Sequence, residues 1–523
     1  MNKIKTIFFF LFVILAVSGP VRAQLSENQM DSLVKKTLVT FNVPGISLVV
    51  VKDGKVVHMK GYGLRSLQTK APVDVHTFFG IASNSKAFTA AGLGILVDEG
   101  KLNWDDKVVD LIPGFKLYNS YVTQEFTIRD LLTHRSGLGL GAGDLMIFPD
   151  SNRVTKSELI HNLRYLKPVS AFRTKFDYDN LLYIVAGEVL AKVSGMSWEE
   201  FIENRIMRPL GMDQSAASYP RLKDKVNSID AHAPVDGALK VISKGFPEIS
   251  NAAGGIWTNA DELSKWVIMQ MNGGKYGESL AKKLFSPEVH EEMWSPQTIM
   301  PGGGLYRNHF RSYGLGWFLG DENGYLEVEH TGGLSGIVSQ VTLIPEMKLG
   351  IIVLTNQESG YAFTSITNSI KDSYFGIKGK DRIKAYKELE KQHEAEGKKV
   401  TEAVWDAIKL QQKKSVEKPD LSRYEGLFRD SWFGEVQIQQ REGKLWFQSL
   451  NSPKLEGEML FYKGNTFVVK WAQRSMNADA FAIFSLDKEG KATGMKMEAI
   501  SPLTDFSYDF QDLDFTKKGQ NKI

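Results

Sequence analysis

The chain has 523 residues, of which 42% are hydrophobic and 24% are charged, and its formal net charge is +3 at pH 7. This length indicates more than one domain, and the composition is ordinary for globular protein. The first 23 residues carry three basic side chains and no acid, so the rest is close to neutral and lacks the charge pattern of a nucleic-acid-binding protein. The chain contains no cysteine, which excludes disulfides, cysteine-linked lipid and thiolate chemistry.

The first 23 residues have the features of a signal peptide. Two lysines precede an apolar run at residues 7–17, and the segment ends Val21-Arg22-Ala23, where small residues suit cleavage before Gln24. A membrane anchor is the alternative, but the apolar run is short for a full span. We therefore expect export, to the periplasm or as a secreted protein, with no membrane span once the signal peptide is removed.

The opening of the mature chain predicts an α+β domain. Residues 26–42 show the amphipathic pattern of a helix, and residues 46–51 and 56–62 are two apolar, β-branched runs around a turn, typical of a hairpin. Residues 91–99 are mostly apolar and contain no proline, which predicts a buried helix that ends at Gly100. A helix, an antiparallel hairpin and a second helix in this order indicate α+β architecture.

Ser83 and Lys86 are the candidate nucleophile and its base. Ser83 precedes the buried helix, where free backbone N–H groups favour negative charge, and Lys86 lies one turn further on the same face. A lysine entering a buried helix is costly without a partner or a task, and activation of a serine would be that task. Ser-x-x-Lys occurs five times in the chain, so the alternative is an N-cap serine beside a solvated lysine.

Two later segments bring polar or small residues to the edges of predicted elements. Tyr178 and Asn180 come directly before an apolar helix at residues 181–193, from which both can point into a shared cleft. His330-Thr331-Gly332-Gly333 precedes two predicted strands at 337–344 and 349–355. Its glycine pair would let a substrate or an oxyanion approach the backbone.

The composition changes after residue 375. Residues 376–420 are rich in lysine and glutamate, which predicts a charged helical linker. Residues 421–515 contain short aromatic and β-branched runs separated by turns, which predicts a small antiparallel, lipocalin-like β domain with an aromatic core. We expect the domain at residues 24–375 to fold without these segments, which would then serve assembly or substrate gating.

Three motifs together resemble the signatures of the penicillin-recognising serine hydrolases. They are Ser83-Asn84-Ser85-Lys86, Tyr178-Asp179-Asn180 and His330-Thr331-Gly332. The nearest branch is that of the class C β-lactamases, D-alanyl-D-alanine carboxypeptidases and related esterases, and the resemblance covers roughly residues 25–375. It implies a β-lactamase/transpeptidase-like fold, in which a helical subdomain lies beside an antiparallel sheet flanked by helices.

The resemblance also implies a role for each motif residue. Ser83 would be the acylated nucleophile, and Lys86 and Tyr178 would share its proton. The substrate-binding residues would be Asn180, His330, Thr331 and Gly332. The oxyanion hole would be formed by the backbone N–H groups of Ser83 and Gly333.

His330 departs from the pattern of most β-lactamases, which have lysine at this position. A histidine with a free pKa near ~6.5 is mostly uncharged at neutral pH, and we expect it to become charged toward pH ~6. Carboxylate-bearing substrates such as β-lactams should then be turned over slowly at neutral pH.

These inferences predict an exported serine hydrolase that acts through an acyl-enzyme on an ester or amide. It would be an esterase, a D-amino-acid peptidase or a β-lactamase-like enzyme for a small-molecule or peptide substrate, and a homo-oligomer is compatible with the sequence. No cluster of side chains has metal-ligand spacing, so no metal or organic cofactor is expected. The alternatives are an acyltransferase that uses the same acyl-enzyme and a non-catalytic penicillin-binding or sensing protein.

Overall fold

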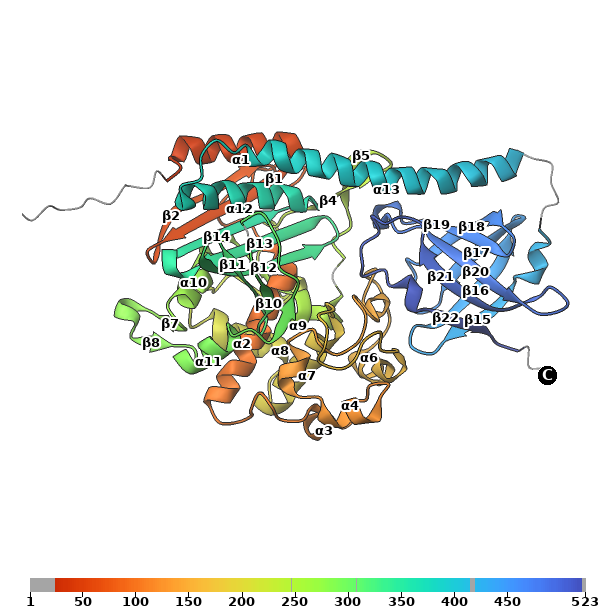
Figure 1. Ribbon diagram of the computed structural model, residues 1–523, viewed down its shortest axis with the longest axis horizontal. Coiled ribbons are helices and arrows are strands. Elements are labelled where there is room, and N and C mark those ends of the chain that lie inside the picture. Colours follow the sequence, from red (N-terminus) through yellow and green to blue (C-terminus); the bar gives the residue numbers. More distant parts are fainter. Residues whose placement is uncertain (1–23, 246, 307, 414–418, 520–523) are drawn as a thin grey trace, which may run out of the picture.

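The computed structural model describes residues 24–245, 247–306, 308–413 and 419–519. A larger α+β domain is followed in the chain by a smaller barrel (Figure 1). The larger domain contains an eight-stranded antiparallel sheet, which confirms the predicted fold class. In spatial order its strands are β2 (Lys55–Gly63), β1 (Gly45–Lys52), β14 (Leu349–Thr355), β13 (Ile337–Ile344), β12 (Tyr325–Leu334), β11 (Phe318–Glu322), β10 (Arg311–Tyr313) and β9 (Thr298–Met300).

Helices cover both faces of the sheet. They are α1 (Glu27–Phe41) and α12 (Gly360–Phe375) on one face, with the long α13 (Arg382–Lys413) packed on them, and α10 (Ala260–Met271) on the other (Figure 1). Alternate residues of β1 enter the two cores: Ile46 and Leu48 lie in the core beneath α1, whereas Val49 and Val51 lie in the opposite core. Because both faces are buried, the central strands are apolar along their length.

Several elements of the larger domain begin and end where the sequence predicts. Ser26 and Gln29 form a capping box at the start of α1, and Asn42 closes it in the left-handed conformation with a φ of 54°. The strands β13 and β14 coincide with the two runs predicted at residues 337–344 and 349–355. Local signals therefore define these elements.

A helical subdomain packs beside the sheet. Its helices are α2 (Ser85–Asp98), α3 (Val108–Leu111), α4 (Ser120–Glu125), α5 (Ile128–Leu131), α6 (Lys156–Asn162), α7 (Leu181–Ser194), α8 (Trp198–Ile202), α9 (Asn251–Gly254) and α11 (Pro287–Met293). The two central helices, α2 along most of its length and α7 in its first ten residues, are largely buried and lie against each other. A Cβ on Gly92 would lie 2.6 Å from Cδ1 of Leu190, so the close approach of the helices depends on this glycine. A short pair, β3 (Phe79–Gly80) and β6 (Trp257–Thr258), leads into α2.

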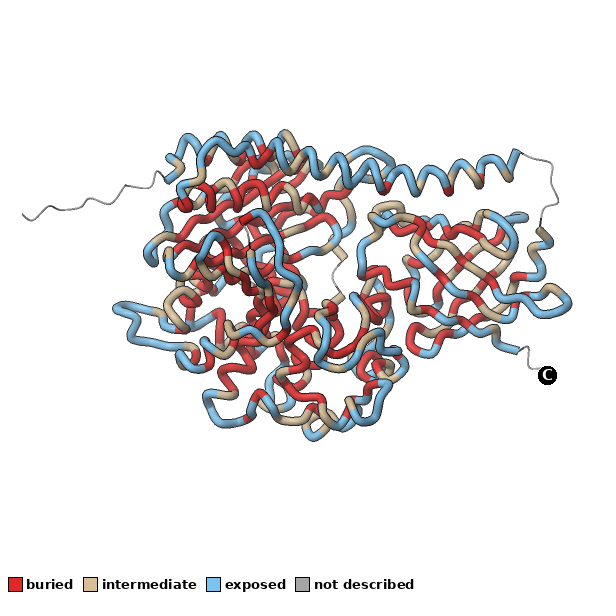
Figure 2. Tube along the Cα trace, viewed as in Figure 1, coloured by how far each residue is buried: buried red, intermediate tan, exposed pale blue. Residues whose placement is uncertain are grey.

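The C-terminal domain is a closed barrel of eight antiparallel strands. They are β15 (Gly426–Asp430), β16 (Gly434–Arg441), β17 (Lys444–Ser449), β18 (Glu456–Lys463), β19 (Thr466–Trp471), β20 (Ala480–Leu486), β21 (Ala492–Ala499) and β22 (Asp514–Lys517). Each strand pairs with the next, and β22 pairs with β15 to close the barrel. Burial alternates along the strands, so the predicted aromatic core is confirmed (Figure 2).

The barrel is seated against the helical subdomain. Asn162 donates to the carbonyl oxygen of Trp432 at 2.8 Å, and Lys454 pairs with Asp150 at 2.5 Å. Buried apolar residues of the two domains form one continuous hydrophobic core. Removal of the barrel would expose part of that core to water, and independent folding of residues 24–375 stays a prediction.

Candidate active site

Ser83 lies in a tight turn between β3 and α2. The turn is the 3-10 segment η1 (Ala82–Asn84), so the serine precedes the helix rather than beginning it. Ala82 has a φ of 50°, which is uncommon for a residue with a Cβ. Gly332 packs against this turn, since a Cβ there would lie 2.2 Å from the carbonyl oxygen of Ile81. This constrained backbone presents Ser83, half-buried, to a cavity.

Lys86 is fully buried near the start of α2, and its ammonium nitrogen contacts three uncharged oxygens. Its Nζ lies 3.1 Å from Oγ of Ser83, 2.7 Å from Oδ1 of Asn180 and 3.0 Å from the carbonyl oxygen of Ala253. Burial lowers the pKa of Lys86 to about 7, although two nearby carboxylates oppose the shift. A neutral amine is therefore accessible near neutral pH, as a base for Ser83 requires.

Tyr178 lies beside the same lysine. The Lys86 Nζ is 4.8 Å from the centre of the Tyr178 ring. The buried phenol hydroxyl makes no hydrogen bond of regular geometry within the described part of the chain. Burial raises the pKa of Tyr178 well above its usual value, and an interaction with Ser83 offsets this only in part. The tyrosine thus keeps its proton at neutral pH, and the geometry favours Lys86 as the proton acceptor.

Asn180 connects Lys86 to a buried carboxylate. Its amide oxygen accepts a hydrogen bond from Lys86, and its Nδ2 donates to Oδ2 of Asp144 at 2.7 Å. Asp144 is completely buried, and burial raises the pKa of its carboxyl well above the usual value. Asn180 lines the cavity, as substrate binding requires, and its side chain also holds the lysine.

Asp179 and His134 hold the segment that carries Tyr178 and Asn180. Oδ1 of Asp179 accepts from the first N–H groups of α7, at 2.8 Å in the case of Leu181. The backbone N–H of Asp179 donates to Nδ1 of His134 at 3.0 Å, and the His134 ring packs 4.2 Å from the Tyr178 ring between centroids. Burial holds the pKa of His134 well below its usual value, so this histidine is a neutral structural residue.

His330, on β12, has both ring nitrogens engaged. Nδ1 lies 2.6 Å from the carbonyl oxygen of Thr331, so it carries the proton, and Nε2 accepts from the hydroxyl of Tyr313 at 2.9 Å. Burial, together with the charge of Lys86, lowers the pKa of His330 to about 3. The expectation that this imidazole becomes charged toward pH ~6 is therefore wrong, because that expectation assumed the solvent-exposed pKa.

Thr331, Gly332 and Gly333 continue β12 beyond the histidine. Gly332 is buried against the serine turn, whereas Gly333 is exposed and has no atom within 4 Å of the place where a Cβ would lie. Thr331 and Gly333 line the cavity, whereas Gly332 packs against the turn that carries Ser83. β12 packs against η1, but an oxyanion hole formed by the N–H groups of Ser83 and Gly333 stays a prediction.

The cavity in front of Ser83 has a volume of about 620 Å³ and is lined by both domains. The barrel contributes two segments, 475–477 and 503–508, and the ring of Phe506 packs edge-on against Tyr178 with 5.9 Å between centroids. Within the described residues, the acidic side chains of the lining are Glu358 and Asp505, and no lysine or arginine lies among them. Burial raises the pKa of Glu358 to about 7. The remaining wall is largely apolar, which suits an uncharged organic group.

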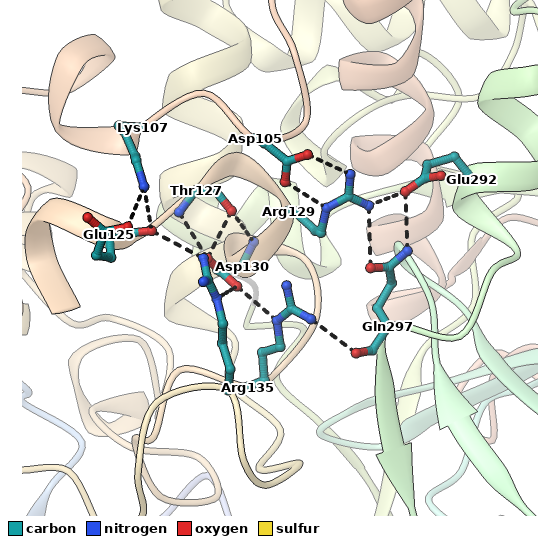
Figure 3. Close-up of polar contacts among 10 residues, drawn as sticks. Asp105, Lys107, Glu125, Thr127, Arg129, Asp130, Arg135, Glu292 and Gln297 are labelled. Carbon is teal, nitrogen blue, oxygen red and sulfur yellow. Dashed lines mark hydrogen bonds and ion pairs between the residues drawn. The ribbon is translucent and has the colours of Figure 1, made fainter.

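An ion cluster around the buried Asp130 lies in the helical subdomain (Figure 3). The fully buried carboxylate of Asp130 pairs with Arg135 at 2.8 Å and with Arg173 at 2.6 Å, and it accepts from Thr127 at 2.8 Å. The backbone N–H of Arg173 also donates to the carbonyl oxygen of Arg135. Burial raises the pKa of Asp130, but its two arginines outweigh burial and hold the pKa below its usual value.

The structure brings all the predicted site residues to one place and adds others. The carbonyl of Ala253 and the carboxylate of Asp144 complete the surroundings of Lys86. Barrel residues, Phe506 among them, complete the cavity. No sequence signal identified these residues, because they become neighbours of Ser83 only through contacts between distant segments.

In the described ranges, no three histidine, aspartate or glutamate side chains are grouped as a metal site would require. In the same ranges, no single helix is long and apolar enough to cross a membrane. One bent helix pair, Leu181–Ser194 with Trp198–Met207, meets the length and composition test jointly, and it is mostly buried within the helical subdomain.

The fold and the serine–lysine–tyrosine arrangement define the class of protein. The chain belongs to the β-lactamase family, whose model matches residues 30–369. A domain of unknown function matches residues 410–517, which include the barrel.

Relatives of known name share this family. The unguisins hydrolase ungD' of Aspergillus campestris is 29% identical over 384 residues, which cover 70% of this chain and 69% of that protein. Protein flp of Staphylococcus aureus is 28% identical over 343 residues, which cover 64% of each chain, so this chain spans less than two thirds of that relative.

Solved structures share the fold. The octameric penicillin-binding protein homologue of Pyrococcus abyssi matches with a TM-score of 0.59 at 23% identity, covering 94% of this chain and 99% of that one. A class C β-lactamase matches with a TM-score of 0.55 at 22% identity, covering 67% of this chain and 96% of that one. The match to the Pyrococcus abyssi protein covers nearly the whole chain and so includes the barrel, whereas the match to the class C β-lactamase covers about two thirds of the chain.

Proposed function

We propose that this protein is an exported serine hydrolase that cleaves esters or amides through an acyl-enzyme at Ser83. The observation that carries the proposal is the 3.1 Å contact between Oγ of Ser83 and Nζ of Lys86, whose pKa burial lowers to about 7. Export rests on the signal-like sequence of residues 1–23, which lie outside the described residues.

The proposed reaction has two halves. Neutral Lys86 takes the hydroxyl proton of Ser83 while Oγ attacks the carbonyl carbon of the substrate, and the resulting oxyanion is stabilised by backbone N–H donors. The carbonyl re-forms, the alcohol or amine leaves with a proton returned from the lysine, and Ser83 stays acylated. Water then attacks the acyl carbon, its proton passes to the lysine, and the acid is released as Ser83 recovers its hydrogen.

The charges around the cavity favour substrates without a carboxylate. A β-lactam carries such a group, and neither the neutral His330 nor the acidic pair Glu358 and Asp505 offers it a cationic partner. Neutral esters and amides need no cationic partner, and the apolar wall accommodates an uncharged acyl group. The relative named as an unguisins hydrolase supports the hydrolase class, and the substrate of this chain is left to experiment.

The test uses the purified mature protein with three substrates: a neutral p-nitrophenyl ester, nitrocefin and a D-alanyl-D-alanine peptide. Wild type should hydrolyse the ester faster than the other two, and Ser83→Ala should abolish all turnover. Ser136→Ala serves as the control, because this serine lies outside the cavity lining. Turnover that persists in Ser83→Ala would refute the proposal, and stoichiometric acylation without turnover would favour the binding or sensing alternative. Faster product formation with added alcohol acceptors, with ester product detected, would favour the acyltransferase.

A further inference from the structure

One carboxylate of the barrel reaches the loop behind the active site. Asp509 follows β21, is completely buried, and accepts the backbone N–H groups of Gly143 at 2.6 Å and Leu145 at 3.0 Å. These two residues flank Asp144 in the loop at 141–146. Gly143 lies 366 positions away from Asp509 in the sequence, so this contact forms only when the barrel is in place.

Asp509 supplies the hydrogen-bond acceptors for a turn that has no capping side chain of its own. The 3-10 turn η2 (Asp144–Met146) starts at Gly143, which has a φ of 80° and no side chain to accept the free N–H groups. Free N–H groups at such a turn need an outside acceptor, and the buried carboxyl group of Asp509 receives two of them, one on each oxygen. A Cβ on Gly141 would lie 2.6 Å from the carbonyl oxygen of Phe506, so the barrel also packs directly against this loop.

The capped loop is bonded to two residues of the candidate active site. Oδ2 of Asp144 accepts from Asn180 at 2.7 Å, and Asn180 in turn accepts from Lys86 at 2.7 Å. The backbone N–H of Gly141 donates to the carbonyl oxygen of Tyr178 at 2.8 Å. A shift of this loop therefore moves the acceptor that aims Lys86 at the serine.

We propose that Asp509 is a positioning residue for Lys86 and acts through Asp144 and Asn180. Asp509 is not among the residues that line the cavity, so it cannot touch substrate where it lies. The barrel therefore helps to position a catalytic residue and also lines the cavity. This inference rests on the proposed roles of Ser83 and Lys86.

The experiment measures the rate at which a fluorophosphonate labels Ser83 in the full-length mature protein. This probe reports the nucleophilicity of the serine and carries no amide for Asn180 to recognise. Asp509→Asn replaces one of the two acceptor oxygens by an amide group that cannot accept. Asp512→Asn is the matched control, because it lies three residues further in the same segment and its carboxylate makes no hydrogen bond to the loop at 141–146 in the described residues. Circular dichroism confirms that each variant is folded at the assay temperature.

We expect Asp509→Asn to lower the labelling rate at least tenfold and Asp512→Asn to change it less than twofold. In an Asn180→Ala background, Asp509→Asn should lower the labelling rate less than threefold, because the hydrogen bonds through which Asp509 acts are already missing. An equal loss in both backgrounds, or no difference between Asp509→Asn and Asp512→Asn, overturns the inference. If Asp509→Asn does not fold, Asp509→Glu, which keeps the carboxyl group on a longer side chain, is expected to lower the labelling rate at least threefold with the same dependence on Asn180. Absence of labelling in wild type would instead overturn the proposed function.

Discussion

The amide oxygen of Asn180 lies 2.7 Å from the ammonium nitrogen of Lys86, and it is a neutral acceptor. The chain contains a second buried lysine with different partners, since Lys371 lies 2.5 Å from Glu327 and 3.1 Å from Glu322. Burial acts against the charge of both lysines. For Lys371 the two carboxylates outweigh burial and raise the pKa, whereas burial lowers the pKa of Lys86 to about 7. The difference between a structural and a candidate catalytic lysine therefore lies in the charge of their acceptors.

The pH dependence of ester hydrolysis should report Lys86. Since its pKa is about 7 and the neutral form is the base, kcat/KM for a neutral ester should rise about tenfold per pH unit below pH 7 and level off above it. Tyr178→Phe should lower the plateau and keep the midpoint. A midpoint near pH 9 or above would show that the lysine is not the titrating base.

The two buried lysines should differ in their effect on stability. The pKa of Lys86 is about 7 in the folded state and near ~10.4 when unfolded, so unfolding takes up a proton between these values and stability should rise by about 1.4 kcal/mol per pH unit. Lys86→Met should lack this increment, which differential thermal unfolding at pH 7.5 and 9 can measure. Lys371→Met should be destabilised by about 3–5 kcal/mol at neutral pH, because it leaves two buried carboxylates without their cation. Equal pH slopes in wild type and Lys86→Met would contradict the first part.

The preference between substrates should not change with the charge of His330. Its pKa of about 3 keeps the ring neutral throughout the working range. In a Glu358→Gln variant, which removes a cavity carboxyl whose pKa burial raises to about 7, the ratio of kcat/KM for a neutral ester to that for a penicillin should therefore be the same at pH 8 and pH 6. Both values should fall together at the lower pH as Lys86 gains its proton. A ratio that moves more than fivefold toward the penicillin would show that the imidazole becomes charged.

Two adjacent glycines on β12 should respond differently to alanine. At Gly332 a Cβ would lie 2.2 Å from the carbonyl oxygen of Ile81, so Gly332→Ala must displace the serine turn and should lose at least about 2 kcal/mol of stability together with activity. At Gly333 a Cβ would meet open space, so the free energy of unfolding of Gly333→Ala should lie within about 0.5 kcal/mol of the wild-type value. Thermal unfolding and ester turnover of both variants test the contrast, and similar losses in the two would contradict it.

The buried carboxylate of Asp130 should stabilise the protein only while it is charged. Its pKa is held below the unfolded value, so its contribution is present above the unfolded pKa near ~3.9 and is lost as the pH falls through the folded value. At neutral pH Asp130→Ala should cost about 2–3 kcal/mol, because Thr127 and Arg135 lose a buried acceptor. Asp105→Ala, which removes an exposed partner of Arg129, should cost less than about 1 kcal/mol. Denaturant unfolding at pH 7 compares them, and equal costs would refute the assignment.

The sequence by itself determined the helices and strands that carry strong local signals, and it identified the three motifs that contain Ser83, Tyr178 and His330. The predicted strands at 337–344 and 349–355 coincide with β13 and β14 because uninterrupted apolar runs between turns specify buried strands. The motifs at Ser83, Tyr178 and His330 meet around one cavity because their order along the chain follows that of the family fold. The bounds of the elements depend on neighbours in the sequence, and the motifs are recognised by their resemblance to the family.

Only the tertiary structure decided the chemistry of those residues. The pKa of Lys86 depends on burial and on neutral acceptors from Asn180 and Ala253, and that of His330 depends on burial beside Lys86. The place of the barrel beside the cavity, and the bond from Asp509 to Gly143, join segments more than three hundred residues apart. Desolvation and long-range hydrogen bonds arise when distant segments pack together, so no local pattern contains them.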